Sequence, residues 1–260
     1  MSHIRAYQPA DRPALYDVCV RTANAGGDAR GIFSHDHLWG DVWAVPYAER
    51  HPDLAWVVES DDKRVIGYIV ATDNTDAFET WFRDEWWPTR APAYSKGVPD
   101  ARGAAGDGGG AGVGRAGADV GDDSGAGGAG PDAGGGAGVG DDSDAGGAGA
   151  GVGGGAGVRG SDPEREQRVI AMAAHRGPGQ EPFAAEYPAH LHIDLLPETQ
   201  GQGLGRKLMD TLTAELRRRG VAGLHLGMDP ANKGAAVFYE RLGFDRLPTS
   251  DGSLKYGLRL

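Results

Sequence analysis

The stretch that decides the fold of this chain is the run Leu195-Leu196-Pro197-Glu198-Thr199-Gln200-Gly201-Gln202-Gly203-Leu204-Gly205-Arg206. Residues 190–196 alternate between polar and apolar side chains, as a strand does, and residues 203–219 carry leucine at every fourth position, as an amphipathic helix does. The first N–H groups of a helix have no partner within it, and together with the helix dipole they favour an anion such as a phosphate. Alternating glycines let the backbone approach such a ligand closely, and Arg206 adds positive charge. The run therefore predicts a strand, an anion-binding turn and a long helix.

Two better-known phosphate-binding patterns do not fit this turn. No Gly-Lys-Ser or Gly-Lys-Thr triplet ends it, which excludes a P-loop. The glycines stand at 201, 203 and 205, which is not the spacing of the dinucleotide-binding fingerprint. The alternative is that no ligand binds here and that the glycines only make the start of the helix more flexible.

The remaining pattern predicts a mixed α/β sheet in one domain. Strands are expected at 4–7, 54–59, 64–71, 223–228 and 253–260, the last as an edge or hairpin strand, and further helices after Asp11 and at 37–50, 75–87, 163–176 and 231–242. Pro46 predicts a kink or break, Gly67 a bulge or a close approach, and Pro88 the end of the helix before it. The aromatic residues of the first half either line an acceptor groove or fill the core: Trp39, Trp43, Tyr47, Trp81, Trp86 and Trp87.

A glycine-rich segment divides this domain. Residues 101–160 hold 27 of the 45 glycines and no aromatic residue, leucine or isoleucine. Ordering such a segment would cost much backbone entropy with almost no apolar burial to offset it, which predicts a flexible acidic insertion. We therefore expect residues 1–100 and 161–260 to be two halves of one domain.

Composition and charge exclude several classes of protein. The formal net charge is −11, which argues against a general nucleic-acid binder. No apolar run reaches the roughly 18 residues needed to cross a bilayer, and no apolar segment follows Met1 as in a signal peptide. The single cysteine, Cys19, excludes an internal disulfide. The sequence predicts a cytoplasmic protein without a metal site, and a homodimer is compatible with it.

The glycine turn and a second segment together resemble one known family. Gln200, Gly203 and Gly205 match the Q/R-x-x-G-x-G/A loop of the GNAT superfamily of N-acetyltransferases. The second segment is similar to that superfamily's downstream cofactor-binding segment through Asn232, Ala235, Phe238, Tyr239, Glu240, Gly243 and Phe244. The segments around 187–194 and 229–232 are also similar to the acetyltransferase-like domain of O-GlcNAcases and its stand-alone bacterial relatives.

The resemblance implies acetyl-CoA bound where the strands at 190–196 and 223–228 splay apart. Backbone N–H groups of the turn would hold the pyrophosphate, the main chain at Leu195 and Leu196 would pair with the pantetheine arm, and Asn232 would touch that arm. The residues implied in binding are Leu195, Leu196, Gln200, Gly201, Gln202, Gly203, Leu204, Gly205, Arg206, Asn232, Phe238 and Tyr239.

Acetyl transfer needs a neutral amine, donors for a tetrahedral oxyanion and a proton for the leaving thiolate. The resemblance implies that Tyr239 supplies this proton, since the pKa of a phenol lies near that of a thiol. The alternative is a packed aromatic residue with a bonded hydroxyl. A backbone N–H near Leu195 would stabilise the oxyanion.

The candidates for the general base that accepts the amine proton are His190, His192 and Asp194. They stand at alternate positions and so share one face of their strand. The pair His190 and His192 is similar to two histidines of arylalkylamine N-acetyltransferases, but it is offset by one residue relative to Gln200. Such a slip reverses the face unless a bulge restores it. The alternative is that both histidines pack under a helix with satisfied nitrogens.

The preferred interpretation is an N-acetyltransferase that transfers acetyl directly to a primary amine in a ternary complex. The acceptor would be a small amine or a lysine-containing partner. The main alternative is a non-catalytic acetyl-CoA-binding protein that acts as a sensor or binding module. A third hypothesis makes the glycine-rich segment an assembly element.

Overall fold

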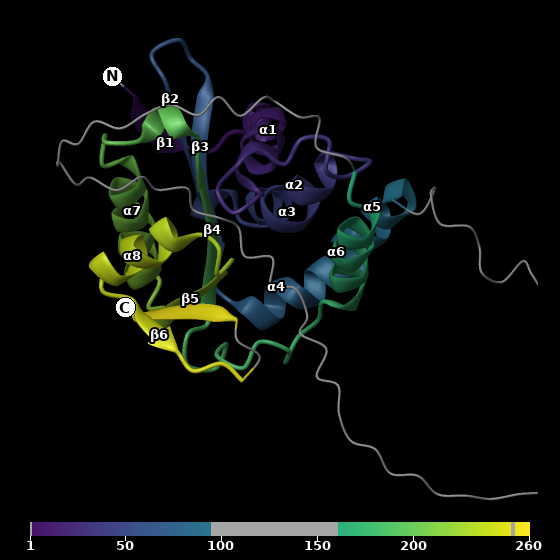
Figure 1. Cartoon of the computed structure of the whole chain (residues 1–260). Helices are drawn as coiled ribbons and strands as arrows, with labels where there is room; N and C mark the ends of the chain where they lie inside the picture. Colours follow the sequence, from purple (N-terminus) through teal and green to yellow (C-terminus); the bar gives the residue numbers. More distant parts are fainter. Residues whose placement is uncertain (1, 95–160, 251–252) are drawn as a thin grey trace, which may run out of the picture.

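The computed structural model describes residues 2–94, 161–250 and 253–260 of the chain (Figure 1). The insertion expected at 101–160 lies outside the described residues. Residues 2–94 and 161–260 both contribute strands to one sheet.

The sheet has seven strands in the order β1-β2-β3-β4-β5-β7-β6. The first half supplies β1 (His3–Ala6), β2 (Ala55–Glu59) and β3 (Val65–Thr72), and the second supplies β4 (Ala189–Leu195), β5 (Gly223–Met228), β6 (Asp245–Leu247) and β7 (Leu254–Arg259). Every neighbouring pair is antiparallel except β4 and β5, which run parallel. The expected mixed α/β sheet is confirmed, and most of its strand pairs are antiparallel.

The two central strands separate soon after they begin. The pairing of β4 with β5 is limited to Ala189 with Leu224 and His190 with His225. From Leu191 onward β4 keeps its ladder with β3 on one edge, up to Leu195, while its other edge has left β5. This is the splayed centre that the family resemblance predicts.

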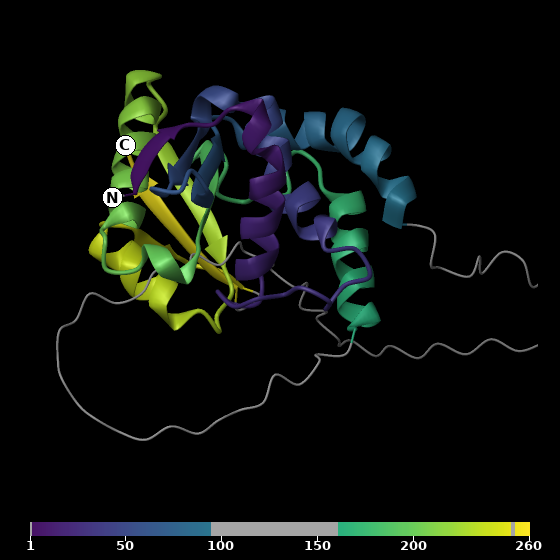
Figure 2. The ribbon, with the colours of Figure 1, turned by 90° about the horizontal axis from the view of Figure 1, so that it is seen from above.

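Helices cover both faces of the sheet. Figures 1 and 2 show α7 (Leu204–Arg218) on one side of the central strands and the helices of the first half, with α6 (Pro163–His175), on the other. The leucines at 204, 208, 212 and 216 are all buried, so the predicted apolar stripe of α7 faces the sheet. Gly220, with φ of 73°, ends this helix in the left-handed conformation that glycine adopts without strain.

The first three helices of the chain lie close to where the sequence predicts them. The helix after Asp11 is α1 (Arg12–Thr22), and the helix expected at 37–50 is divided into α2 (His37–Trp43) and α3 (Val45–Arg50). The break lies at Ala44, two residues before Pro46, which confirms that prediction. A short 3-10 turn, Pro52–Leu54, then leads into β2.

The glycine at 67 serves both purposes suggested for it. The pairing of β2 with β3 shifts register between Val58 and Glu59, where Val58 lies opposite Gly67. An added Cβ at 67 would lie 2.4 Å from Cδ2 of Leu195 on the neighbouring strand. Glycine therefore permits the bulge and the close packing of β3 on β4.

One expectation about an element end is wrong. The helix from residue 75 does not stop before Pro88, because α4 (Thr75–Trp81) continues through a π-helical turn (Phe82–Trp86) into α5 (Trp87–Tyr94). In that turn the Trp87 N–H donates to the Phe82 carbonyl, and the widened backbone accommodates a proline ring that an α-helix would reject. Of the two forms expected for the C-terminal strand, the hairpin is found: β7 pairs with β6 and lies between β5 and β6, so it is not an edge strand.

Candidate active site

The glycine turn has the geometry expected of an anion-binding helix start. A short 3-10 turn, Pro197–Thr199, follows β4, and Gly201 and Gly203 then take positive φ values of 71° and 64°. No side chain caps α7 at Gly203, so the N–H groups of its first turn are left for solvent or a ligand. Arg206 is exposed on this first turn. Gln200 and Gln202 are exposed too, and the Gln202 amide donates to the Glu198 carbonyl at 2.7 Å.

The free edge of β4 leads from the centre of the sheet to this turn. The Leu196 N–H donates to the Ile66 carbonyl at 3.0 Å, toward β3. Because successive N–H groups of a strand point to opposite edges, those of Ile193 and Leu195 point toward the side that β5 has left. Backbone donors therefore line the gap over the length that the family resemblance assigns to a pantetheine arm.

Asn232 and Tyr239 come from the second segment and differ in their surroundings. The Asn232 side chain accepts the Ala235 N–H at 3.1 Å and so caps α8 (Lys233–Arg241). Tyr239 is buried, with its ring 5.5 Å from that of Phe244 and 6.1 Å from that of Tyr256. Burial raises the pKa of the Tyr239 phenol, and the Asp194 carboxylate raises it further. Phe238 beside it is half-buried.

Asp194 is enclosed rather than directed into a pocket. Its carboxyl accepts a short hydrogen bond from the hydroxyl of Tyr68, which lies opposite it on β3. Burial raises the pKa of Asp194 to about 7, although hydrogen bonds from Tyr68 and Thr22 favour the ionised form. Asp194 is thus poised to change its charge near neutral pH, and its charge raises the pKa values of Tyr239 and the buried Cys19.

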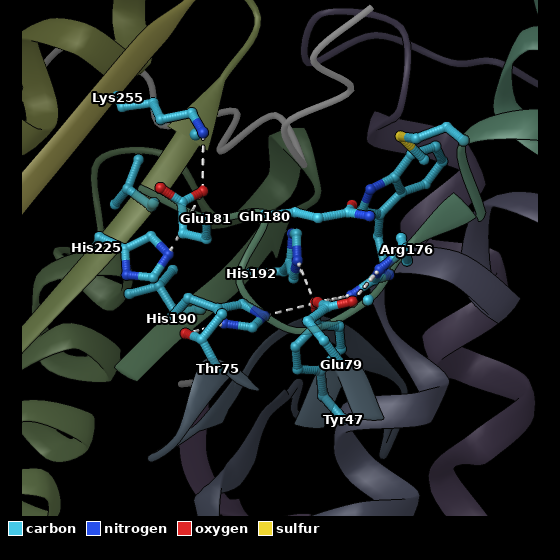
Figure 3. A pocket seen from close by; sticks show the side chains of 16 residues that line it. Tyr47, Thr75, Glu79, Arg176, Gln180, Glu181, His190, His192, His225 and Lys255 are labelled. Atoms are coloured by element: carbon cyan, nitrogen blue, oxygen red, sulfur yellow. Dashed lines mark hydrogen bonds and ion pairs between the residues drawn. The ribbon is translucent and has the colours of Figure 1, made fainter. Parts of the chain in front are cut away.

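A pocket of about 270 Å³ opens where β4 and β5 part. Leu191 and His192 line it from β4, and Leu226 and Gly227 from β5, each just beyond the last paired residues. Its remaining walls come from α2, α3, α4, α6, the segment after α6 and β7, and Figure 3 shows the side chains that line it. Trp43 and Tyr47 also line it, whereas the other four tryptophans of the aromatic set lie in the core or against it.

Both predicted histidines of this strand reach the pocket and meet at one hydroxyl. The Tyr47 oxygen lies 2.8 Å from Nε2 of His190 and 3.1 Å from Nε2 of His192. Nδ1 of His190 lies 2.8 Å from the Thr75 hydroxyl, so both of its ring nitrogens have partners. The β3–β4 register is unbroken from Gly67 to Thr72, so no bulge re-aims the histidines.

A largely buried ion pair, between Arg176 and Glu79, adjoins this cluster. The Arg176 guanidinium donates to both carboxylate oxygens of Glu79, at 2.9 and 2.6 Å, and to the Tyr47 hydroxyl at 3.1 Å. Burial, together with the charge of Arg176, lowers the pKa of His192 to about 3. Burial likewise holds the pKa of His190 well below its ordinary value. Both imidazoles are therefore neutral at physiological pH.

A second charged group lies across the pocket. Glu181 accepts from Lys255 of β7 at 2.8 Å and lies 3.9 Å from Nε2 of His225 on β5. His225 uses its Nδ1 on the Tyr187 carbonyl at 2.7 Å. The pocket thus offers two carboxylates and two cations on opposite walls, as Figure 3 shows.

The sequence predicted the site residues on β4 but not the residues of other elements that surround them. His190 and His192, which were expected to share one face of their strand, both contact the Tyr47 hydroxyl, while Asp194 contacts the Tyr68 hydroxyl instead. Glu79, Arg176, Thr75, Glu181, His225 and Lys255 were not singled out. Tyr47 was noted only as one of six aromatic residues, and the glutamate and arginine carry no local signal because they lie 97 positions apart.

Among the described residues, no cluster of three or more potential metal ligands occurs. In the same part of the chain, no helix is both long and apolar enough to cross a membrane. Cys19 is buried, which raises the pKa of its thiol.

Comparison with known proteins supports the resemblance in the second half. Residues 161–244 match the model of the Acetyltransferase (GNAT) family. The ribosomal-protein-bS18-alanine N-acetyltransferase of Escherichia coli K12 is 44% identical over 68 residues, which are 24% of this chain and 46% of that protein. The mycothiol acetyltransferase of Kocuria rhizophila is 35% identical over 89 residues, 34% of this chain and 28% of that protein. The chain thus spans less than half the length of these curated relatives.

One solved structure is similar over the whole chain. The crystal structure of SsHAT superimposes with a TM-score of 0.67 at 29% identity and covers 99% of this chain and 98% of its own. The segment that matches the family model contains both the glycine turn and the second segment. The second half of the chain is therefore similar to the GNAT family of acetyltransferases.

Proposed function

We propose that the protein is an acetyl-CoA-dependent N-acetyltransferase that transfers acetyl directly to a primary amine in a ternary complex. The observation that carries this proposal is the course of the gap between β4 and β5. It begins at a pocket lined by His190 and His192 and runs along free strand edge to the uncapped, glycine-rich start of α7. One end suits an amine, and the other suits a pyrophosphate.

In this proposal the turn from Gly201 to Arg206 holds the pyrophosphate, with Gln200 and Gln202 beside it. The backbone at Leu195 and Leu196 pairs with the pantetheine arm. Asn232 and Phe238 border the same arm, an assignment that rests on the family resemblance.

In the proposed reaction a carbon–nitrogen bond forms and the carbon–sulfur bond of the thioester breaks. The amine nitrogen attacks the thioester carbonyl, the carbon–sulfur bond breaks, and its electron pair leaves on sulfur. The Leu195 N–H stabilises the intermediate oxyanion. Tyr239 donates a proton to the sulfur, and one of the residues His190, His192 and Asp194 accepts the proton that the amine loses.

The pocket favours a small amine or a lysine-containing acceptor. Glu79 and Glu181 place carboxylates on its walls, and Trp43 and Tyr47 add aromatic faces for an alkylammonium. Glu79 is already paired with Arg176 and Glu181 with Lys255, so the pocket suits an acceptor of modest charge rather than a polycation. Such an enzyme would use the cytoplasmic acetyl-CoA pool. A close relation to the acetyltransferase-like domain of O-GlcNAcases remains a prediction.

The test is calorimetric titration of acetyl-CoA into the full-length protein and two glycine variants. Gly203 and Gly220 flank α7, both have positive φ, and an added Cβ at either would meet no atom within 4 Å. Gly203→Ala and Gly220→Ala should therefore each lose about 1 kcal/mol of stability to backbone strain alone. Only Gly203→Ala should weaken acetyl-CoA binding, by tenfold or more, because its methyl projects beside the proposed phosphate.

No binding by the wild type at millimolar ligand, or equal binding by both variants, would refute the cofactor site. Release of CoA in a screen of primary amines then separates the enzyme from a non-catalytic sensor, which binds acetyl-CoA without turnover. Tyr239→Phe keeps the ring and removes the proton, so an unchanged kcat would end the assignment of Tyr239 as the acid.

A further inference from the structure

The hydroxyl of Tyr47 joins two histidines that the family resemblance leaves equivalent as candidate bases. Five close polar contacts link Pro188, Thr75, His190, Tyr47, His192 and Arg176 into one chain. Each contact needs one proton between its two heavy atoms, since two lone pairs at such distances repel. Placing these protons in turn decides which nitrogen of each imidazole is protonated.

The chain is anchored at a carbonyl, which can only accept. The Thr75 hydroxyl lies 2.8 Å from the Pro188 carbonyl oxygen, so the hydroxyl proton points there. The 2.8 Å contact between Thr75 and Nδ1 of His190 must then be donated by the imidazole. His190 is buried, close to the Arg176 cation, and contacts no carboxylate, so it stays neutral and carries its only ring proton on Nδ1.

The remaining protons follow from that tautomer. Nε2 of His190 is an acceptor, so the Tyr47 hydroxyl donates to it at 2.8 Å. The Tyr47 oxygen then has two lone pairs, of which one accepts from Arg176 at 3.1 Å. The other must accept from Nε2 of His192 at 3.1 Å. His192 is neutral as well, so its Nδ1 carries a lone pair.

The two histidines consequently differ in what they offer a substrate. Both nitrogens of His190 are engaged within the chain. Among the described residues, Nδ1 of His192 has no hydrogen-bond partner. Figure 3 shows His192 standing in the pocket, with one nitrogen joined to Tyr47 and the other directed away from it, into the space beside Gln180.

We propose that Tyr47, Thr75 and His190 are positioning residues that hold His192 in its Nε2–H tautomer, so that Nδ1 of His192 is the proton acceptor for the incoming amine. This inference rests on the proposed function. As the carbon–nitrogen bond forms, the amine nitrogen becomes acidic and its proton passes to Nδ1. The imidazolium so formed keeps its Nε2–H on Tyr47 and returns the added proton to solvent, while Tyr239 protonates the departing sulfur.

Nitrogen NMR of full-length protein labelled with ¹⁵N-histidine tests the tautomers without acetyl-CoA. In a neutral imidazole the protonated and the bare nitrogen resonate far apart, and their couplings to the ring protons identify each. His190→Gln and His192→Gln assign the two rings among the eight histidines. At pH 7 we expect His190 protonated on Nδ1 and His192 on Nε2. The reverse tautomer, or a charged ring, at either position would overturn the proposal.

Kinetics test whether this positioning matters. Tyr47→Phe keeps the ring stacked on Phe78 but removes the hydroxyl, so His192 should become a mixture of tautomers and kcat for CoA release should fall 10- to 100-fold with little change in KM. Thr75→Val should lower kcat in the same way, and Thr75→Ser, which keeps the hydroxyl, should restore it. An unchanged kcat in Tyr47→Phe, or equal loss in the valine and serine variants, would refute the positioning role. Failure of the proposed function shows separately, as absence of acetyl-CoA binding by calorimetry.

Discussion

Asp194→Asn should change the way in which the stability of the protein depends on pH. The Asp194 carboxyl is 2% exposed and accepts the Tyr68 hydroxyl. Burial raises its pKa from 3.8 to about 7. Asparagine keeps the shape of the side chain and an oxygen for Tyr68, but it does not titrate.

The sign and size of the effect follow from proton linkage. Between pH 3.8 and pH 7 the unfolded chain has released the Asp194 proton while the folded protein retains it, so stability falls as pH rises. Below this window Asp194 has no effect, and above it the penalty is constant. Each unit of difference in pKa corresponds to about 1.4 kcal/mol, so the wild type should lose about 2.5 kcal/mol relative to Asp194→Asn between pH 5 and pH 8.

Urea denaturation of both proteins at half-unit steps from pH 5 to pH 8 measures this difference. Subtracting the two free energies of unfolding removes every other titrating group that the variants share. Tyr68→Phe is the second comparison, because losing the donor raises the Asp194 pKa and moves the window upward. A difference between wild type and Asp194→Asn that stays constant to within 0.5 kcal/mol, taken as about the error of such extrapolations, would refute a buried carboxyl with a raised pKa.

Two further substitutions test the packing beneath the site. Gly67→Ala would place a Cβ 2.4 Å from Cδ2 of Leu195, so it should lower the free energy of unfolding by about 1–3 kcal/mol. The matched control is Gly227→Ala, whose Cβ would have no atom within 4 Å. In the same denaturation experiment it should change the free energy of unfolding by less than about 0.5 kcal/mol. Glu79→Gln leaves the buried Arg176 guanidinium without its counter-ion and should cost about 3–5 kcal/mol, read as a lower urea midpoint at unchanged m-value.

The control for the second substitution is Glu164→Gln. That carboxylate is 89% exposed and lies 4.0 Å from Arg168, so its loss should change stability by less than about 1 kcal/mol. Equal costs at the buried and the exposed pair would contradict the view that Glu79 neutralises a desolvated charge.

Much of the fold could be predicted from local patterns, because those patterns act over a few residues. The leucine stripe of α7, the glycine at 220 that ends it and the break before Pro46 all depend on neighbouring backbone, and each is found where expected. The continuation through Pro88 depends instead on a π turn packed against other helices: the Trp86 indole donates to the Asp41 carbonyl at 2.8 Å. The rule that a proline ends a helix considers only neighbouring residues, so it could not predict that this contact lets the helix continue.

The candidate site divides in the same way. The sequence by itself determined the glycine turn at the start of α7 and placed His190 and His192 on one face of a strand, since helix starts and strand alternation are properties of consecutive residues. Only the tertiary structure decided that His190 and His192 share the hydroxyl of Tyr47, 143 and 145 positions away, while Asp194 is sealed from them. Such contacts depend on which helix covers which part of the sheet, and that is settled by packing of the whole core rather than by any short run of residues.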